Sequence, residues 1–100
     1  MNYYVVIDKD FEELVATFLK GRLEDIFFLK ESLKKRDFEK ISYIGHKIKG
    51  AAYNYGFDEI GDIGEKIENY SLTEDGDNIK SLVDKLEDYL KNINIGYEEM

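Results

Sequence analysis

Apolar residues recur at helical spacing along most of this chain, and no proline interrupts them. In a helix of 3.6 residues per turn this spacing gathers apolar side chains on one face, which another element must cover. The pattern predicts helices at about 11–18, 22–36, 37–56, 58–70 and 78–94, joined by short connections. We therefore expect an all-α protein, built as an antiparallel bundle of four or five amphipathic helices.

Acidic and glycine residues mark the expected helix boundaries. Asp10, Asp37 and Asp58 each stand where an N-cap is expected, because a short carboxylate accepts from the free amides of the first turn. Gly21 predicts a bend or break between the first two helices, and Gly56 predicts a left-handed C-terminal turn. Residues 1–9 are expected to be an extended lead-in, since a strand at residues 5–7 has no evident partner. Residues 71–78 are expected to form a loop, and residues 95–100 a frayed end.

Two helices carry expectations about packing. The helix at 22–36 is predicted to turn one face inward, widened by Phe28 and Leu29; this face holds Leu23, Ile26, Phe27, Lys30 and Leu33. In the helix at 58–70, Gly61 and Gly64 lack side-chain bulk, so a neighbouring helix is expected to approach closely there.

Size and composition narrow the function. One hundred residues make one domain, residues 1–100 with a core at about 8–93. The absence of cysteine excludes disulfides, thiolate catalysis and thiolate metal sites. The 22 Asp and Glu against 14 Lys and Arg disfavour nucleic acid as a partner, because phosphate contacts supply most of such affinity. No apolar run is long enough to cross a bilayer and no basic leader opens the sequence, so we expect no membrane association and a cytoplasmic location.

His46 is the single histidine, and it lies within the third predicted helix on the side away from the core. At 100° per residue it is about 160° from Ile48, which marks the core face. The same outward sector holds Tyr43, Gly50 and Tyr53, with Lys49 at its edge. A glycine inside a helix costs about 1 kcal/mol relative to alanine, which suggests that something must come close at this position.

An exposed imidazole is a competent nucleophile near neutral pH, since its unperturbed pKa is about 6.5. Lys47 and Lys49 would favour its neutral form and then stabilise an attached anion. One histidine without cysteine, and with Tyr43 where a di-iron bundle needs a glutamate, makes a metal site a poor alternative. A serine-hydrolase triad is unsupported, because no Gly-x-Ser-x-Gly segment exists.

The run His46-Lys47-Ile48-Lys49-Gly50, with Gly56 ten residues after the histidine, resembles the His-x-Leu-Lys-Gly…Gly signature of histidine phosphotransfer (HPt) domains. The likeness extends over roughly residues 8–93, through the helix that begins near Phe18-Leu19 and the segment from Ile63 to Glu68. Ile48 replaces the usual leucine, and Gly45 stands where a small residue, often alanine, precedes the histidine. Glu68, 22 residues after the histidine, replaces a glutamine that often hydrogen-bonds the ring.

This resemblance implies a monomeric four-helix bundle with an additional short N-terminal helix. It implies that His46 accepts a phosphoryl group from a receiver-domain aspartate and passes it to another receiver. Lys49 would stabilise the phosphate, and Glu68 would orient the imidazole. The docking face would hold Gly50, Lys47, Tyr43 and Tyr53. Partners would be the receiver domains of response regulators or hybrid histidine kinases. The domain would have no ATP site and no cofactor, since the metal ion belongs to the receiver.

Two other interpretations stay open. A histidine-kinase dimerisation bundle also carries a phosphorylated histidine, but it usually has an acidic residue directly after the histidine and a proline soon after. Here Lys47 follows His46 and the chain has no proline. A non-catalytic helical interaction module, which merely inherited the bundle, is the second alternative.

Overall fold

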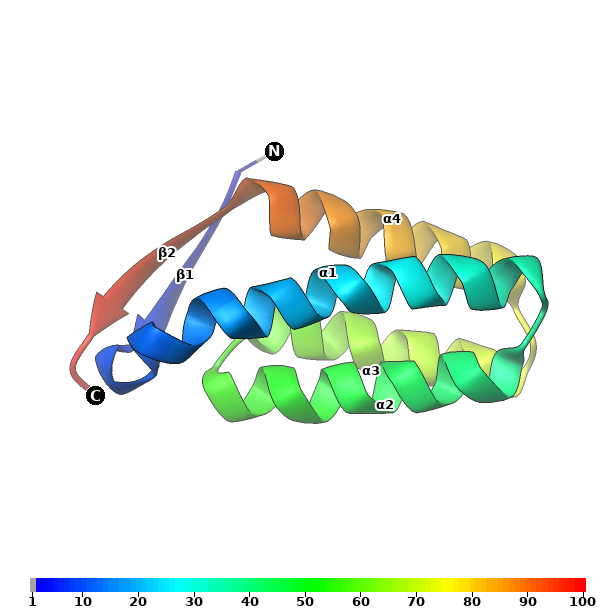
Figure 1. Ribbon diagram of the computed structural model, residues 1–100, viewed down its shortest axis with the longest axis horizontal. Coiled ribbons are helices and arrows are strands. Elements are labelled where there is room, and N and C mark those ends of the chain that lie inside the picture. Colours follow the sequence, from blue (N-terminus) through cyan, green and yellow to red (C-terminus); the bar gives the residue numbers. More distant parts are fainter. Residues whose placement is uncertain (1) are drawn as a thin grey trace.

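Four helices and two terminal strands make up the protein in this computed structural model, which describes residues 2–100 (Figure 1). Within these residues the element order is β1 (Tyr3–Asp8), the 3₁₀ turn η1 (Lys9–Phe11), α1 (Glu12–Lys34), α2 (Phe38–Tyr55), α3 (Asp58–Leu72), α4 (Gly76–Asn92) and β2 (Ile93–Glu98). The helices lie side by side in an elongated bundle, and the strands lie together at one end of it. The predicted four-helix bundle is confirmed.

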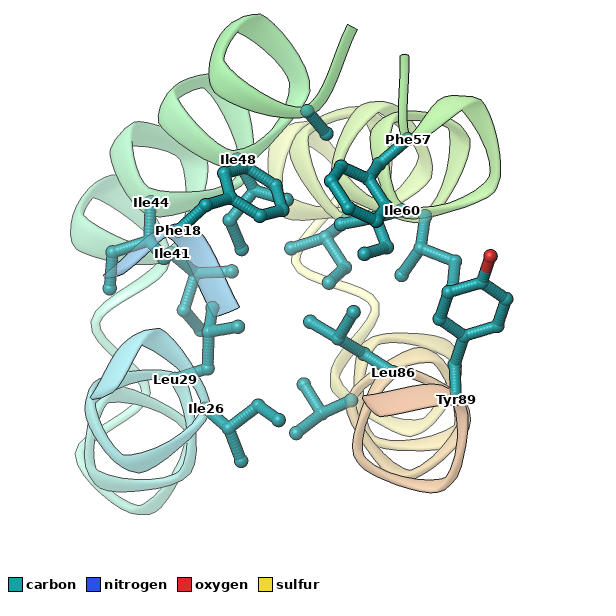
Figure 2. Packing of buried hydrophobic residues seen from close by; sticks show 14 of the residues in the cluster. Phe18, Ile26, Leu29, Ile41, Ile44, Ile48, Phe57, Ile60, Leu86 and Tyr89 are labelled. Carbon is teal, nitrogen blue, oxygen red and sulfur yellow. The ribbon is translucent and has the colours of Figure 1, made fainter. Parts of the chain in front are cut away.

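The apolar faces of the helices meet in one core that is rich in isoleucine (Figure 2). Ile41, Ile44 and Ile48 project from α2 into this core with at most 3% of their surface exposed. Phe57, in the tight connection between α2 and α3, is fully buried and stacks on Phe18 of α1 with ring centroids 4.8 Å apart. Burial of each such side chain contributes about 1.5–3 kcal/mol to the stability of the fold, and together these side chains hold α2 against its neighbours.

The boundaries of α2 agree with the sequence. The Asp37 carboxylate accepts a hydrogen bond from the Lys40 amide at 3.1 Å, and Gly56 ends the helix at φ +86°. Asp58 was wrongly predicted as the cap of α3: Phe57 occupies that position, without a side-chain hydrogen bond. Asp58 is instead the first helical residue, where a negative charge still favours the positive end of the helix dipole.

Two other predicted boundaries are also wrong. Asp10 lies inside η1, and it is the Asp8 carboxylate that accepts a hydrogen bond from the Asp10 amide. Asp75 caps α4 by accepting from the Asn78 amide at 3.1 Å. The loop between α3 and α4 is therefore residues 73–75, shorter than the predicted 71–78, because α3 runs on to Leu72 and α4 begins at Gly76.

The first two predicted helices are a single one. α1 runs from Glu12 to Lys34 straight through Gly21, and the additional N-terminal helix is reduced to the η1 turn. Glycine costs a helix about 1 kcal/mol, which the buried residues on both sides of Gly21 outweigh.

The inward face of α1 is also rotated from the predicted one. Ile26 and Leu29 are buried as expected, whereas Leu23 and Phe27 are 51% and 59% exposed. Arg22 and Asp25 are buried in their place. α1 packs against both α2 and α4, so its inward face points between those two helices.

The two chain ends were expected to be an extended lead-in and a frayed end, but they form two strands that pair with each other. β1 and β2 form a parallel two-stranded sheet, with Tyr3 opposite Ile93 and Asp8 opposite Glu98. Alternate residues of both strands pack on the core, and Ile7 is 1% exposed. The whole bundle is the long crossover that parallel pairing requires.

Candidate functional site

α2 and α3 cross at two glycines, and this crossing sets the geometry around the histidine. A β-carbon on Gly45 would lie 2.9 Å from the carbonyl oxygen of Gly64 and from the amide nitrogen of Glu68. A β-carbon on Gly64 would lie 2.8 Å from the Lys49 amide nitrogen. The close approach predicted at Gly64 is thus confirmed, and it places the Glu68 side chain next to His46.

The imidazole of His46 is held on one side and open on the other. Its Nδ1 lies 2.9 Å from Oε2 of Glu68, and the two side chains are 73% and 24% exposed. Because an ionised carboxylate only accepts, Nδ1 carries the ring proton of the neutral imidazole and Nε2 keeps its lone pair. Among residues 2–100 no group hydrogen-bonds Nε2, so the lone pair of this nitrogen is unengaged on a largely exposed side chain.

The two lysines beside the histidine differ in their freedom. Nζ of Lys47 lies 2.8 Å from Oδ1 of Asp25, a carboxylate that is only 3% exposed and also accepts from Arg22 Nε at 2.8 Å. Lys49, one turn from His46, has no carboxylate partner within residues 2–100. Of the two lysines, Lys47 is thus engaged in an ion pair and Lys49 is not, within the described residues.

The buried ion pair of Arg22 and Asp25 was not predicted from the sequence. A charged pair at i,i+3 within an apolar segment is the signal that could have revealed it. The guanidinium lies over the Phe18 ring at 4.8 Å, which lets its stem and plane pack while its charge meets the carboxylate.

The remaining predicted residues fall on one side of α2. A β-carbon on Gly50 would meet nothing within 4 Å, so the helix surface there is open. Tyr43 is 68% exposed. The Tyr53 ring lies against Gly61, and its hydroxyl donates to Asp62 at 2.5 Å.

The environment of Tyr53 changes its acidity. The hydrogen bond to Asp62 raises the pKa of the phenol well above its ordinary value near 10, and the charge of Glu65 adds to this effect. Tyr53 thus ties α2 to α3 instead of standing free on the surface.

An open hollow of about 560 Å³ lies between α2 and the end of α3, beside the histidine. Its lining residues are Phe38, Glu39, Ser42, Tyr43, His46, Glu68, Ser71, Leu72 and Glu74.

A second surface feature lies on α1. The exposed rings of Phe27 and Phe28 meet edge to face with centroids 5.3 Å apart, and Leu23 is exposed one turn before Phe27. The ammonium group of Lys40 on α2 lies 5.3 Å from the centroid of the Phe28 ring, so this apolar patch reaches the α1–α2 seam.

Two further properties concern residues 2–100 alone. They contain no group of three or more His, Cys, Asp or Glu side chains placed to hold a metal ion. No helix among them is long and apolar enough to span a membrane.

Comparison with known protein families places most of the chain within a family model. The family model described as "Hpt domain" matches residues 13–95, which include all of α2, α3 and α4 and almost all of α1. No curated protein and no solved structure matches the chain.

Proposed function

Because this chain belongs to the Hpt-domain family, whose members act in histidine phosphotransfer with receiver domains, we propose that His46 is its phosphoacceptor. It takes a phosphoryl group from the aspartate of one receiver and passes it to another. The observation that carries this proposal is the contact between Nδ1 of His46 and Glu68, which leaves Nε2 exposed. Hpt domains are phosphocarrier modules, and this one needs no ATP site of its own.

In the forward step the lone pair of Nε2 attacks the phosphorus of the receiver's aspartyl phosphate. The phosphorus–oxygen bond to the aspartate breaks, the carboxylate leaves with the electron pair, and a phosphorus–nitrogen bond forms. The ring gains positive charge during the attack while Nδ1 keeps its proton. Glu68, 2.9 Å from Nδ1, stabilises that charge, and Lys49 screens the phosphoryl oxygens. The second receiver reverses these steps, and the metal ion of each step belongs to the receiver.

Glu68 differs from a glutamine in that its charge also repels the phosphoryl group. It approaches the ring at Nδ1, on the far side from Nε2, which keeps the negative charge away from the phosphorus. We expect Glu68 to raise the nucleophilicity of Nε2 at some expense to the lifetime of the phosphohistidine.

The receiver docks over the outer surface of α2 and the α1–α2 seam. Gly50 offers a surface without a side chain, and Tyr43 offers an exposed aromatic ring. Lys47, held by Asp25 at the seam, and Tyr53, held by Asp62, form the edges of the docking face. The apolar patch of Leu23, Phe27 and Phe28 extends it onto α1. Aromatic residues in a polar surrounding are typical of protein interfaces.

We expect the domain to act as a cytoplasmic monomer.

The test is transfer of labelled phosphate from phosphorylated receiver domains of the source organism to this protein, with His46→Gln alongside. We expect acid-labile, base-stable label on the native protein and none on the variant. A folded native protein that no receiver labels would contradict the proposal and favour a non-catalytic interaction module. Label on His46→Gln would place the phosphate elsewhere.

A further inference from the structure

The hollow between α2 and α3 shares its rim with the phosphoacceptor, because His46 itself is one of its lining residues. A receiver that brings its aspartate to His46 from the outer surface of α2 therefore also meets the rim of the hollow. The chemistry of the lining then constrains what the covering surface can be.

The charged groups of the hollow are all negative. Glu39 and Glu74 line it without an ion pair or a side-chain hydrogen bond among residues 2–100, and the Glu68 carboxylate is engaged with His46. None of the lining residues is a lysine or an arginine. Covering two unpaired carboxylates with a neutral or acidic surface removes their hydration without replacement, which is costly. A matching partner must place cationic groups there.

Three of the residues that line the hollow are apolar or aromatic. Leu72 on α3 and Tyr43 on α2 are 75% and 68% exposed, and Phe38 lies on the α2 side with 9% of its surface exposed. An exposed leucine and tyrosine around a recess beside a functional group are typical of a contact that an apolar side chain fills.

Resting on the function proposed above, we infer that the α2–α3 hollow selects among receivers. The preferred receiver inserts an apolar side chain between Leu72 and Tyr43, and it presents lysine or arginine to Glu39 and Glu74. A receiver with an acidic side chain at the corresponding place is rejected by charge. The same carboxylates disfavour a second copy of this acidic chain or a phosphate-bearing ligand in the hollow.

The test separates docking from chemistry. Glu39→Lys/Glu74→Lys and Leu72→Ala change exposed side chains only, so the bundle remains folded. Glu12→Lys/Glu13→Lys makes the same charge change at the start of α1, where both residues are exposed and neither lines the hollow. Each protein is phosphorylated in two separate assays. One assay uses phosphoramidate, which needs no docking. The other uses a panel of phosphorylated receivers at about 0.05 and 0.5 M salt.

We expect the charge reversal to lower kcat/KM with the preferred receiver about tenfold at low salt, and less at high salt, because exposed charges act mainly on association. Leu72→Ala should lower it at both salt concentrations. Phosphoramidate labelling should stay unchanged, and the Glu12→Lys/Glu13→Lys control should transfer like the native protein. If both hollow variants accept phosphate from every receiver of the panel as that control does, the inference is overturned and the proposed function is left intact. Failure of every receiver to label the native protein would overturn both.

Discussion

Gly45 and Gly50 lie five residues apart in α2, and the structure predicts opposite effects for the same substitution to alanine. A β-carbon on Gly50 would meet nothing within 4 Å, so Gly50→Ala should gain the helix propensity difference alone, about 1 kcal/mol. A β-carbon on Gly45 would lie 2.9 Å from two backbone atoms of α3, which cannot move without separating the helices. Gly45→Ala has the same propensity gain but adds an overpacking cost of about 1–3 kcal/mol.

The difference in unfolding free energy between the two variants therefore isolates the steric cost of the α2–α3 crossing. Urea unfolding followed by circular dichroism measures it directly. Gly50→Ala should raise Tm by about 4–8 °C, the shift that 1 kcal/mol produces in a domain of this size. Two variants stabilised alike would refute the close approach of α3 at Gly45.

The same pair also separates stability from transfer. Gly50→Ala should slow transfer from receivers roughly tenfold despite its higher stability, if a side chain there costs about 1.4 kcal/mol at the docked surface. Its phosphoramidate labelling should be that of the native protein. Gly45→Ala should slow both reactions, because displacing α3 moves Glu68 away from His46. If Gly50→Ala receives phosphate at the native rate, the absence of a side chain at Gly50 is not needed for the receiver to dock.

Three further predictions concern the scaffold. Asp25→Ala should lower the unfolding free energy by about 3–5 kcal/mol, since it leaves a buried guanidinium unpaired, whereas Lys47→Met should cost under about 1 kcal/mol; equal losses in urea unfolding would contradict this. Ile7→Ala should cost about 2–5 kcal/mol yet leave phosphoramidate labelling unchanged, and slower labelling of the folded variant would tie the strands to the site. The hydrogen bond to Asp62 raises the pKa of Tyr53, so the stability that this bond contributes is fully present below about pH 10 and is lost as the pH rises further. The urea midpoint of the native protein should therefore fall above pH 10, and it should fall less in Tyr53→Phe.

The boundaries of α2 and the outward position of His46 were predictable because both depend on local sequence. The inward positions of the α2 isoleucines follow from helical spacing, and Gly56 ends α2 through its own backbone conformation. The rotation of α1 was not predictable in this way. Periodicity assigns Leu23 and Phe27 inward by their hydrophobicity, but the directions of α2 and α4 decide which face of α1 is covered.

The terminal strands show a different limit. Tyr3, Val5 and Ile7 alternate with exposed residues, and so do Ile93 and Ile95, which is the signal of two half-buried strands. Neither segment indicates its partner, because the paired residues are about ninety positions apart. Only the completed bundle brings the two segments together.

That parallel pairing also determines how the domain responds to mechanical load. The start of β1 and the end of β2 lie at opposite ends of the ladder, since Tyr3 faces Ile93 and Asp8 faces Glu98. A pull on the two chain ends would therefore load the evenly spaced hydrogen bonds of the ladder together, in shear, instead of opening them one after another. The helices, which carry His46, would bear no tension until the ladder separated, so the paired strands would keep a pull on the chain ends from distorting the surroundings of His46.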